Sequence, residues 1–184
     1  SDADAPRAAG MLQRACTRLD SEACRLLGAM ALLGRGTALQ PERAVVLFET
    51  ACEAGNQAGC ADLAMLMAAG EGTFADVPHA VRLLEGACDA HVARACGELA
   101  RRAREGDGIP ADANRAERLS RTACEDGHVP SCVSLAHAGA SDASTLLERA
   151  CTSGASEACM ELAASVRGSD ARRAAQLFSR ACEA

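Results

Sequence analysis

The chain has 184 residues, and its formal charge of −6 disfavours a general nucleic-acid binder, because an anionic protein lacks the broad basic surface that phosphate contacts require. All 19 basic residues are arginines, which excludes chemistry that depends on a P-loop lysine, a Schiff-base lysine or a Ser-x-x-Lys pair. No apolar run reaches the length of about 18 residues that a bilayer requires, so we expect no membrane span. The only aromatic residues are Phe48, Phe74 and Phe178, which indicates a core of small side chains.

A pair of cysteines separated by seven residues recurs five times along the chain. The pairs are Cys16/Cys24, Cys52/Cys60, Cys88/Cys96, Cys124/Cys132 and Cys151/Cys159, and Cys182 begins a sixth copy. The intervals between the first cysteines are 36, 36, 36, 27 and 31 residues, whereas the gap within a pair never changes. This constancy predicts disulfides within each pair and an unpaired Cys182. Buried free thiols and metal ligation are the alternatives, although the histidines keep no fixed offset from the cysteines.

The residues before each first cysteine repeat with the period of a helix. Alanine stands eight residues and one residue before all six first cysteines, and leucine or methionine stands five residues before them. These offsets share one helix face. We therefore expect each first cysteine to close an amphipathic helix, which we call helix A.

A second helix, helix B, is expected after the second cysteine of each pair. Leucine follows that cysteine at three residues and a small residue follows it at four. A glycine then ends the segment, at Gly34, Gly70, Gly106, Gly139 and Gly168. Glycine also occupies one position in the turn between helices A and B, as expected for left-handed backbone, but Leu19 and His91 replace it in two copies.

The connection from helix B to the next helix A ends in residues that start helices, namely Pro41, Asp76 and Asp112. We expect helix pairs over residues 5–34, 41–70, 77–106, 113–139 and 142–168, followed by an unpaired helix over 170–184. The fourth connection is nine residues shorter than the others. The whole of 1–184 is expected to form a single repeat domain.

The recurring pattern contains Arg-Ala, Leu, Ala-Cys, Gly, a second Ala-Cys, then Leu-Ala or Leu-Gly, and a Gly-x-Gly corner. It resembles Sel1-like repeats over about residues 5 to 184, and the Cys-x(7)-Cys spacing resembles the cysteine-rich branch typified by the Helicobacter cysteine-rich proteins. The resemblance implies an all-α fold, an α/α solenoid with a right-handed superhelix related to tetratricopeptide arrays. It also implies one disulfide per helix pair. The sequence departs from the family pattern because a non-aromatic residue replaces the tyrosine often found in helix B.

No catalytic constellation is apparent. Ser134 precedes His137 by three residues on an expected helix B, a spacing that could join a nucleophile to a base, but no carboxylate is placed to complete the group. His91 and His128 fall in turns between helices A and B, where local hydrogen bonding is the simpler interpretation. We expect no catalytic residue, no metal site and no cofactor.

A basic stripe on helix A is the strongest functional signal. Offsets nine, six and two before the first cysteine share a side of the helix away from the alanine face. The candidate partner-binding residues on this stripe are Arg43, His79, Arg82, Arg115, Arg118 and Arg149. Glutamates follow a neighbouring side, so pairing between adjacent helices is a structural alternative. The functional interpretation is a groove for an acidic or carboxylate-bearing partner, since arginine binds carboxylates through two parallel hydrogen bonds.

These patterns predict a monomeric repeat protein that binds a protein or peptide as an adaptor, scaffold or inhibitor. The cysteine content favours a periplasmic or secreted location, and we expect that a signal sequence is absent from this form, because the first residues lack a basic start and an apolar run. The alternative is a β-lactam-binding or β-lactamase-like protein, which the resemblance to the cysteine-rich relatives implies. The absence of lysine and of clustered histidines supplies no chemistry for that alternative.

Overall fold

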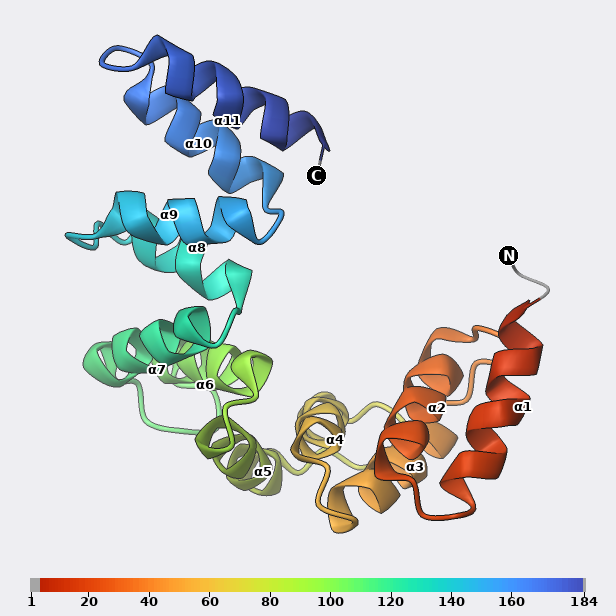
Figure 1. Cartoon of the computed structure of the whole chain (residues 1–184). Helices are drawn as coiled ribbons and strands as arrows, with labels where there is room; N and C mark the ends of the chain where they lie inside the picture. The colour runs from red at the N-terminus through yellow and green to blue at the C-terminus, as the bar shows by residue number, and fades with distance from the viewer. Residues whose placement is uncertain (1–3, 184) are drawn as a thin grey trace. The chain divides into compact units, whose positions relative to one another are not determined.

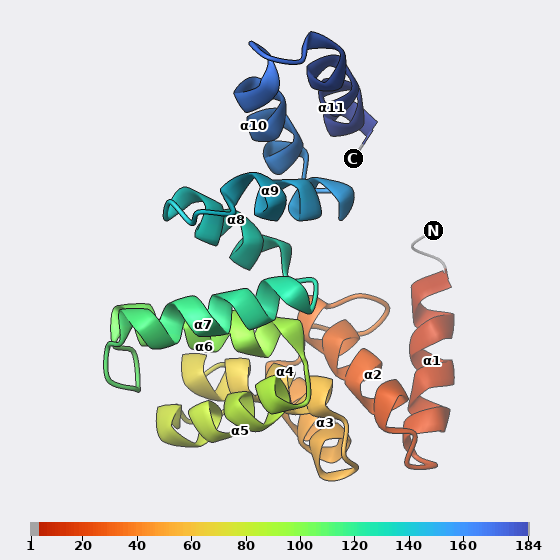
Figure 2. The same ribbon diagram turned by 60° about the vertical axis from the view of Figure 1, so that its left-hand side comes forward.

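The computed structural model describes residues 4–183, and every regular element within that range is an α-helix (Figures 1 and 2). The helices are α1 (Asp4–Cys16), α2 (Ser21–Leu33), α3 (Pro41–Glu53), α4 (Gln57–Ala69), α5 (Val77–Asp89), α6 (Ala93–Glu105), α7 (Ala113–Glu125), α8 (Val129–His137), α9 (Ala143–Thr152), α10 (Ser156–Val166) and α11 (Ala171–Glu183). Odd-numbered helices are the expected A helices and even-numbered ones are the B helices. The all-α array of five helix pairs and one final helix is therefore confirmed.

The chain divides into two compact units, Ser1–Ala95 and Cys96–Ala184, which we call unit 1 and unit 2. Each unit has its own apolar core. The core of unit 1 surrounds Leu27 and Phe48, and the core of unit 2 surrounds Leu135 and Leu162. The single repeat domain expected over 1–184 stays a prediction.

Side-chain caps explain where several helices begin. The carboxylate of Asp20 accepts a hydrogen bond from the Ala23 amide at 3.0 Å, and the Asn56 side chain accepts one from Gly59 at 2.8 Å. Asp76 and Asp112 cap α5 and α7 in the same way, as their positions predicted. An N-cap side chain of this kind satisfies an amide that the first turn of a helix leaves without a partner.

The turn between helices A and B adopts the left-handed backbone that its glycines predicted. Gly55 has a φ of 84°, and Leu19 and His91 adopt the same region with φ of 65° and 60°.

One expected helix end is wrong. Helix α10 ends at Val166, and Gly168 lies beyond it without left-handed backbone, so the cap geometry of Gly34 and Gly70 is not repeated there.

Disulfides join the end of a helix A to the start of the following helix B. The bonds are Cys16–Cys24, Cys52–Cys60, Cys124–Cys132 and Cys151–Cys159, each with a sequence separation of 8 and a Cα–Cα distance of 4.5–4.8 Å. Cys88 and Cys96 are also disulfide-bonded, whereas Cys182 is free and exposed. The predicted disulfides and the predicted unpaired cysteine are therefore confirmed.

Small residues bring the helices close together. The alanine just before the first cysteine is fully buried in α3, α5, α7 and α9. In unit 1 the fully buried ring of Phe48 lies against Gly28, where an added Cβ would come within 2.7 Å of Cε1. Helix α1 differs, since Met11 occupies a core offset but is 57% exposed.

Reduction of the disulfides is expected to lower the melting temperature strongly. Each bridge closes a loop of roughly nine residues, which contributes about 2.5 kcal/mol in the chain-entropy model. Thermal unfolding followed by circular dichroism, with and without reductant, measures the effect. A thiol titration of the native protein should detect Cys182 alone, and an unchanged melt after complete reduction would contradict the stabilising role.

Gly28→Ala is expected to destabilise unit 1 by about 1–3 kcal/mol, because the new methyl group would overlap the buried Phe48 ring. Gly86→Ala is the matched control. Gly86 is exposed on α5 and has no atom within 4 Å of its added Cβ, so this change should stabilise the helix by about 0.5–1 kcal/mol. Urea unfolding of both variants gives the comparison, and equal effects would argue against the close Gly28–Phe48 packing.

Candidate protein-binding surfaces

The six stripe residues predicted from sequence all lie on A helices, but their surroundings differ. Arg43 is on α3, His79 and Arg82 are on α5, Arg115 and Arg118 are on α7, and Arg149 is on α9. His79 and Arg115 are half-buried, whereas the other four are exposed. The six stripe residues therefore differ in their exposure to solvent.

Residues at offset nine contact the preceding A helix. Within unit 1, Arg43 Nη2 donates to Gln13 Oε1 on α1. Within unit 2, Arg173 Nη2 donates to Glu148 Oε1 on α9 at 2.8 Å. Gln13 and Glu148 both stand three residues before a first cysteine. The sequence left pairing between neighbouring helices open as an alternative to partner binding. That pairing is present at these two places.

Arginines at offsets six and two are available to solvent instead. Arg82, Arg118 and Arg149 are exposed, and none of the three forms an ion pair within residues 4–183. An unpaired guanidinium on a helix surface keeps its full set of donors for a carboxylate on another molecule.

The B helices of unit 1 carry an ion network that the sequence did not predict. At its centre is Asp62 on α4, which is 9% exposed. Asp62 Oδ1 lies 2.5 Å from Arg94 Nη1 on α6, and its Oδ2 lies 3.4 Å from Arg25 Nη1 on α2. Arg94 also donates to the Ala58 carbonyl at 2.6 Å. One carboxylate on α4 thus bridges two arginines, one from the preceding B helix α2 and one from the following B helix α6.

Glu22 extends this network at the surface. It accepts hydrogen bonds from Arg25 at 2.6 and 2.9 Å and from Asn56 Nδ2 at 3.0 Å. The hydrogen bonds from Arg25 lower the pKa of Glu22 to about 2, with a smaller contribution from Asn56, despite partial burial that acts in the opposite direction. Two arginines and two carboxylates leave the network without net charge, so we assign it a structural role.

Unit 2 contains a similar network on α6. Arg101 pairs with Glu98, Glu105 and Asp107, and the buried Arg102 pairs with Glu98 and Asp107, each at 2.9 Å. Burial raises the pKa of Glu98, but the hydrogen bonds and charges of Arg101 and Arg102 outweigh it and hold the pKa below its ordinary value. These arginines stabilise the corner after α6 and are already occupied.

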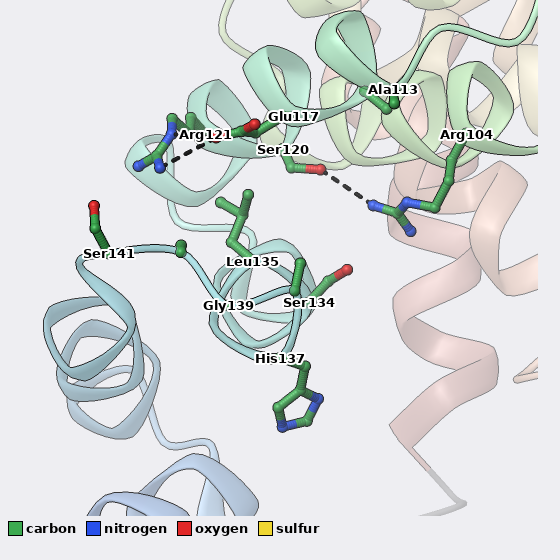
Figure 3. A pocket seen from close by; sticks show the side chains of 13 residues that line it. Arg104, Ala113, Glu117, Ser120, Arg121, Ser134, Leu135, His137, Gly139 and Ser141 are labelled. Atoms are coloured by element: carbon green, nitrogen blue, oxygen red, sulfur yellow. Dashed lines mark hydrogen bonds and ion pairs between the residues drawn. The ribbon is translucent and has the colours of Figure 1, made fainter.

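A pocket of about 720 Å³ lies in unit 2 between α6, α7, α8 and the short corner after α8 (Figure 3). Arg104 extends into it from α6, and its Nη2 lies 3.5 Å from the Ser120 hydroxyl on α7. Across the pocket, Arg121 is held by Glu117 at 3.3 Å and by Asp142 at 3.0 Å. Ser134 lies on the α8 side.

The histidines have local partners. His128 Nδ1 lies 2.8 Å from the Ser131 hydroxyl, and its ring packs so close to Gly97 that an added Cβ there would come within 2.5 Å. Burial lowers the pKa of His128. His137 Nε2 lies 2.7 Å from Glu161 Oε2, so its hydrogen bond is directed to α10 rather than to Ser134.

Within the described part of the chain, no group of three or more His, Cys, Asp or Glu side chains is placed to hold a metal ion. No helix in that part combines the length and the apolar character needed to cross a bilayer.

The Sel1 repeat family model matches residues 21–56, 57–91, 93–128 and 156–184. These segments make up more than half of the chain, which therefore belongs to the Sel1 repeat family. A search of curated proteins finds no match.

Two solved structures share the fold at low sequence identity. One is a protective antigen of uropathogenic Escherichia coli strains displaying an SLR fold, with a TM-score of 0.75 and 22% identity. The match covers 94% of this chain but only 40% of that antigen. The other is a Sel1 repeat protein from Oxalobacter formigenes, with a TM-score of 0.69, 20% identity, and coverage of 90% of this chain and 71% of the other.

The sequence contains one signal for the unit 1 network. Asp62 is the only charged residue of the otherwise apolar helix α4, and a lone charge on a buried helix requires a partner. Its partners could not be named from sequence, because Arg25 and Arg94 occupy different positions within their repeats.

The low pKa of Glu22 predicts acid sensitivity. A carboxylate whose folded-state pKa is lowered contributes stability above its unfolded pKa and loses it as the pH falls toward the folded value. We expect stability to fall between pH 4.5 and about 2, and to fall less steeply in Glu22→Gln. Urea unfolding at a series of pH values measures this, with the exposed Glu71→Gln as control. If the free energy of unfolding falls with the same slope at low pH in both variants and in the wild type, Glu22 does not cause the acid sensitivity.

Proposed function

We propose that this protein is an extracytoplasmic binder of another protein, acting as an adaptor, scaffold or inhibitor through its A-helix arginines. The observation that carries the proposal is the contrast between two sets of arginines. Every arginine on the B helices except Arg104 is paired with a carboxylate, whereas Arg82, Arg118 and Arg149 on the A helices are exposed and form no ion pair within residues 4–183. An acidic surface on the partner would supply the missing carboxylates.

Family membership supports the same class of function. Sel1 repeats are generally modules of protein interaction rather than catalysts. Helix arrays present extended surfaces, which suit recognition of another polypeptide. Phe74, which is 95% exposed in the corner between α4 and α5, adds an apolar group of the kind that often anchors interfaces.

The disulfides support the proposed location. Bonds of this kind persist in oxidising compartments and are rare in a reducing cytosol. Ten of the eleven cysteines are disulfide-bonded, so an oxidising environment is indicated and the periplasm or the exterior is proposed.

Replacing Arg82 and Arg118 together with alanine is expected to weaken binding of the partner about tenfold or more, because each arginine would lose charge-assisted hydrogen bonds. The partner is first isolated by co-purification from the extracytoplasmic fraction, and affinity is then measured by calorimetry on the purified pair. The melting temperature should remain unchanged, since neither side chain forms an ion pair within the described residues.

The matched control is Arg35→Ala with Arg167→Ala, which removes the same charge from two exposed positions outside the A helices. If the control pair weakens binding as much as the test pair, general charge attraction rather than the A-helix stripe is responsible. Unchanged affinity in the test pair would reject the proposed surface.

A further inference from the structure

The fourth repeat lacks a large apolar side chain that every other repeat has. Four residues before the first cysteine, the other copies carry leucine or phenylalanine: Leu12, Phe48, Leu84, Leu147 and Phe178. The fourth copy has Ser120 instead, which is only 1% exposed. A serine at a buried core position of an apolar repeat places a polar group where packing would favour a hydrocarbon one.

The preceding helix does not replace the missing volume. Phe48 packs against Gly28, which stands four residues after the second cysteine of the preceding repeat. The residue at the same position in the repeat that precedes Ser120 is Ala100. An alanine cannot fill the space that leucine or phenylalanine occupies elsewhere. Large-to-small differences at core positions destabilise a protein, so such a departure from the repeat is most readily understood at a functional site.

An arginine, Arg104, is directed into this space. Its contact with Ser120 is a long hydrogen bond of 3.5 Å, which leaves most of its five N–H donors without a short partner in unit 2 (Figure 3). Arg101 and Arg102 on the same helix each pair with at least two carboxylates, whereas Arg104 forms no ion pair within the described residues of unit 2. Its charge is therefore available to a ligand.

Arg104 is the pocket arginine that no carboxylate of unit 2 contacts. Arg121 and Glu117 neutralise each other and Asp142 adds a second carboxylate to Arg121. The hydroxyls of Ser134 and Ser141 also line the pocket and can donate hydrogen bonds. One free guanidinium accompanied by hydroxyl donors matches the two oxygens of a carboxylate.

A second pocket adjoins the first and is more apolar. Val129, Pro130 and Val133 line it, and Ser134 and His137 line both pockets. A polypeptide could therefore place a carboxylate beside Arg104 and an apolar side chain against α8. Residues 129–155, which include α8 and the short corner, lie outside the segments that the Sel1 model matches. Part of the lining of both pockets thus belongs to a stretch that departs from the family pattern.

We propose that the fourth-repeat pocket binds a carboxylate of the partner polypeptide, carried by an acidic side chain or by the chain terminus, with Arg104 as its cation. The apolar residue next to that carboxylate packs on Val133. This inference rests on the proposed function, because it names the chemistry by which a protein partner is recognised.

Three synthetic peptides test the pocket: acetyl-Gly-Gly-Leu-Glu-amide, the same peptide with Gln in place of Glu, and the Gln peptide with a free carboxyl terminus. NMR titration follows the Arg104 Nε–H and the backbone amides of Ser120 and Ser134. The Glu peptide or the free-terminus peptide should bind at least about tenfold more tightly than the neutral one. Which of the two binds distinguishes a side-chain carboxylate from a terminal one. Equal titration by all three peptides, or by none, overturns the proposal.

Two variants locate the binding. Arg104→Gln should reduce the affinity for the carboxylate peptide at least about tenfold and leave the neutral peptide unaffected. Ser120→Leu restores the residue type of the other repeats, so it should abolish peptide binding while raising the melting temperature. Retention of binding in a folded Arg104→Gln protein contradicts the assignment, and that variant decides the question if Ser120→Leu does not fold.

Arg167→Ala is the matched control, because Arg167 occupies in the fifth repeat the position that Arg104 has in the third, eight residues after the second cysteine, and is exposed. It should leave the peptide titration unchanged. The test is separate from that of the A-helix surface. If Arg104→Gln loses peptide binding but keeps partner binding, the pocket alone is rejected as a partner site. If the Arg82→Ala, Arg118→Ala variant keeps full partner affinity, the A-helix surface alone is rejected.

Discussion

Close approach of helices over alanine and glycine is the constraint on which this fold depends. With three aromatic residues in the chain, the core cannot be filled by rings, and fully buried alanines such as Ala51 and Ala87 let neighbouring backbones supply the contact instead. The packing then leaves little freedom for compensation: Phe48 is accommodated because Gly28 faces it. The disulfide at each turn fixes the two helices that this packing brings together.

Charge is distributed between the two sets of helices in different ways. On the B helices, arginines such as Arg94 and Arg102 are partly or fully buried and are matched by carboxylates, since an unmatched buried charge would be costly. On the A helices, the contacts between neighbours join offset nine of one helix to offset three of the preceding one, whereas Arg82, Arg118 and Arg149 are exposed. Arginine thus serves structure at most B-helix positions and is available for recognition at exposed A-helix positions and at Arg104.

Much of the fold could be predicted from the sequence, because its determinants are local. Helix starts at Asp76, the left-handed turn at Gly55 and the pairing of cysteines all follow from residues close together in the chain. The ion network could not be predicted, since Arg25 and Asp62 belong to different repeats and meet only after the helices pack. The polar pocket could be predicted only in part. The sequence shows that serine replaces leucine or phenylalanine at position 120, but the position of Arg104 beside it depends on how α6 and α7 pack.

The short span of the disulfides also bears on how the chain matures. Each bridge whose geometry the structure gives joins cysteines only 8 residues apart, so the correct partner is the nearest one along the chain and the entropic cost of closing the loop is small. Oxidation can therefore accompany the formation of single hairpins rather than wait for the whole array. Mispaired intermediates, which demand larger loops, are disfavoured from the outset, and a chain rich in cysteine can reach its native pairing repeat by repeat.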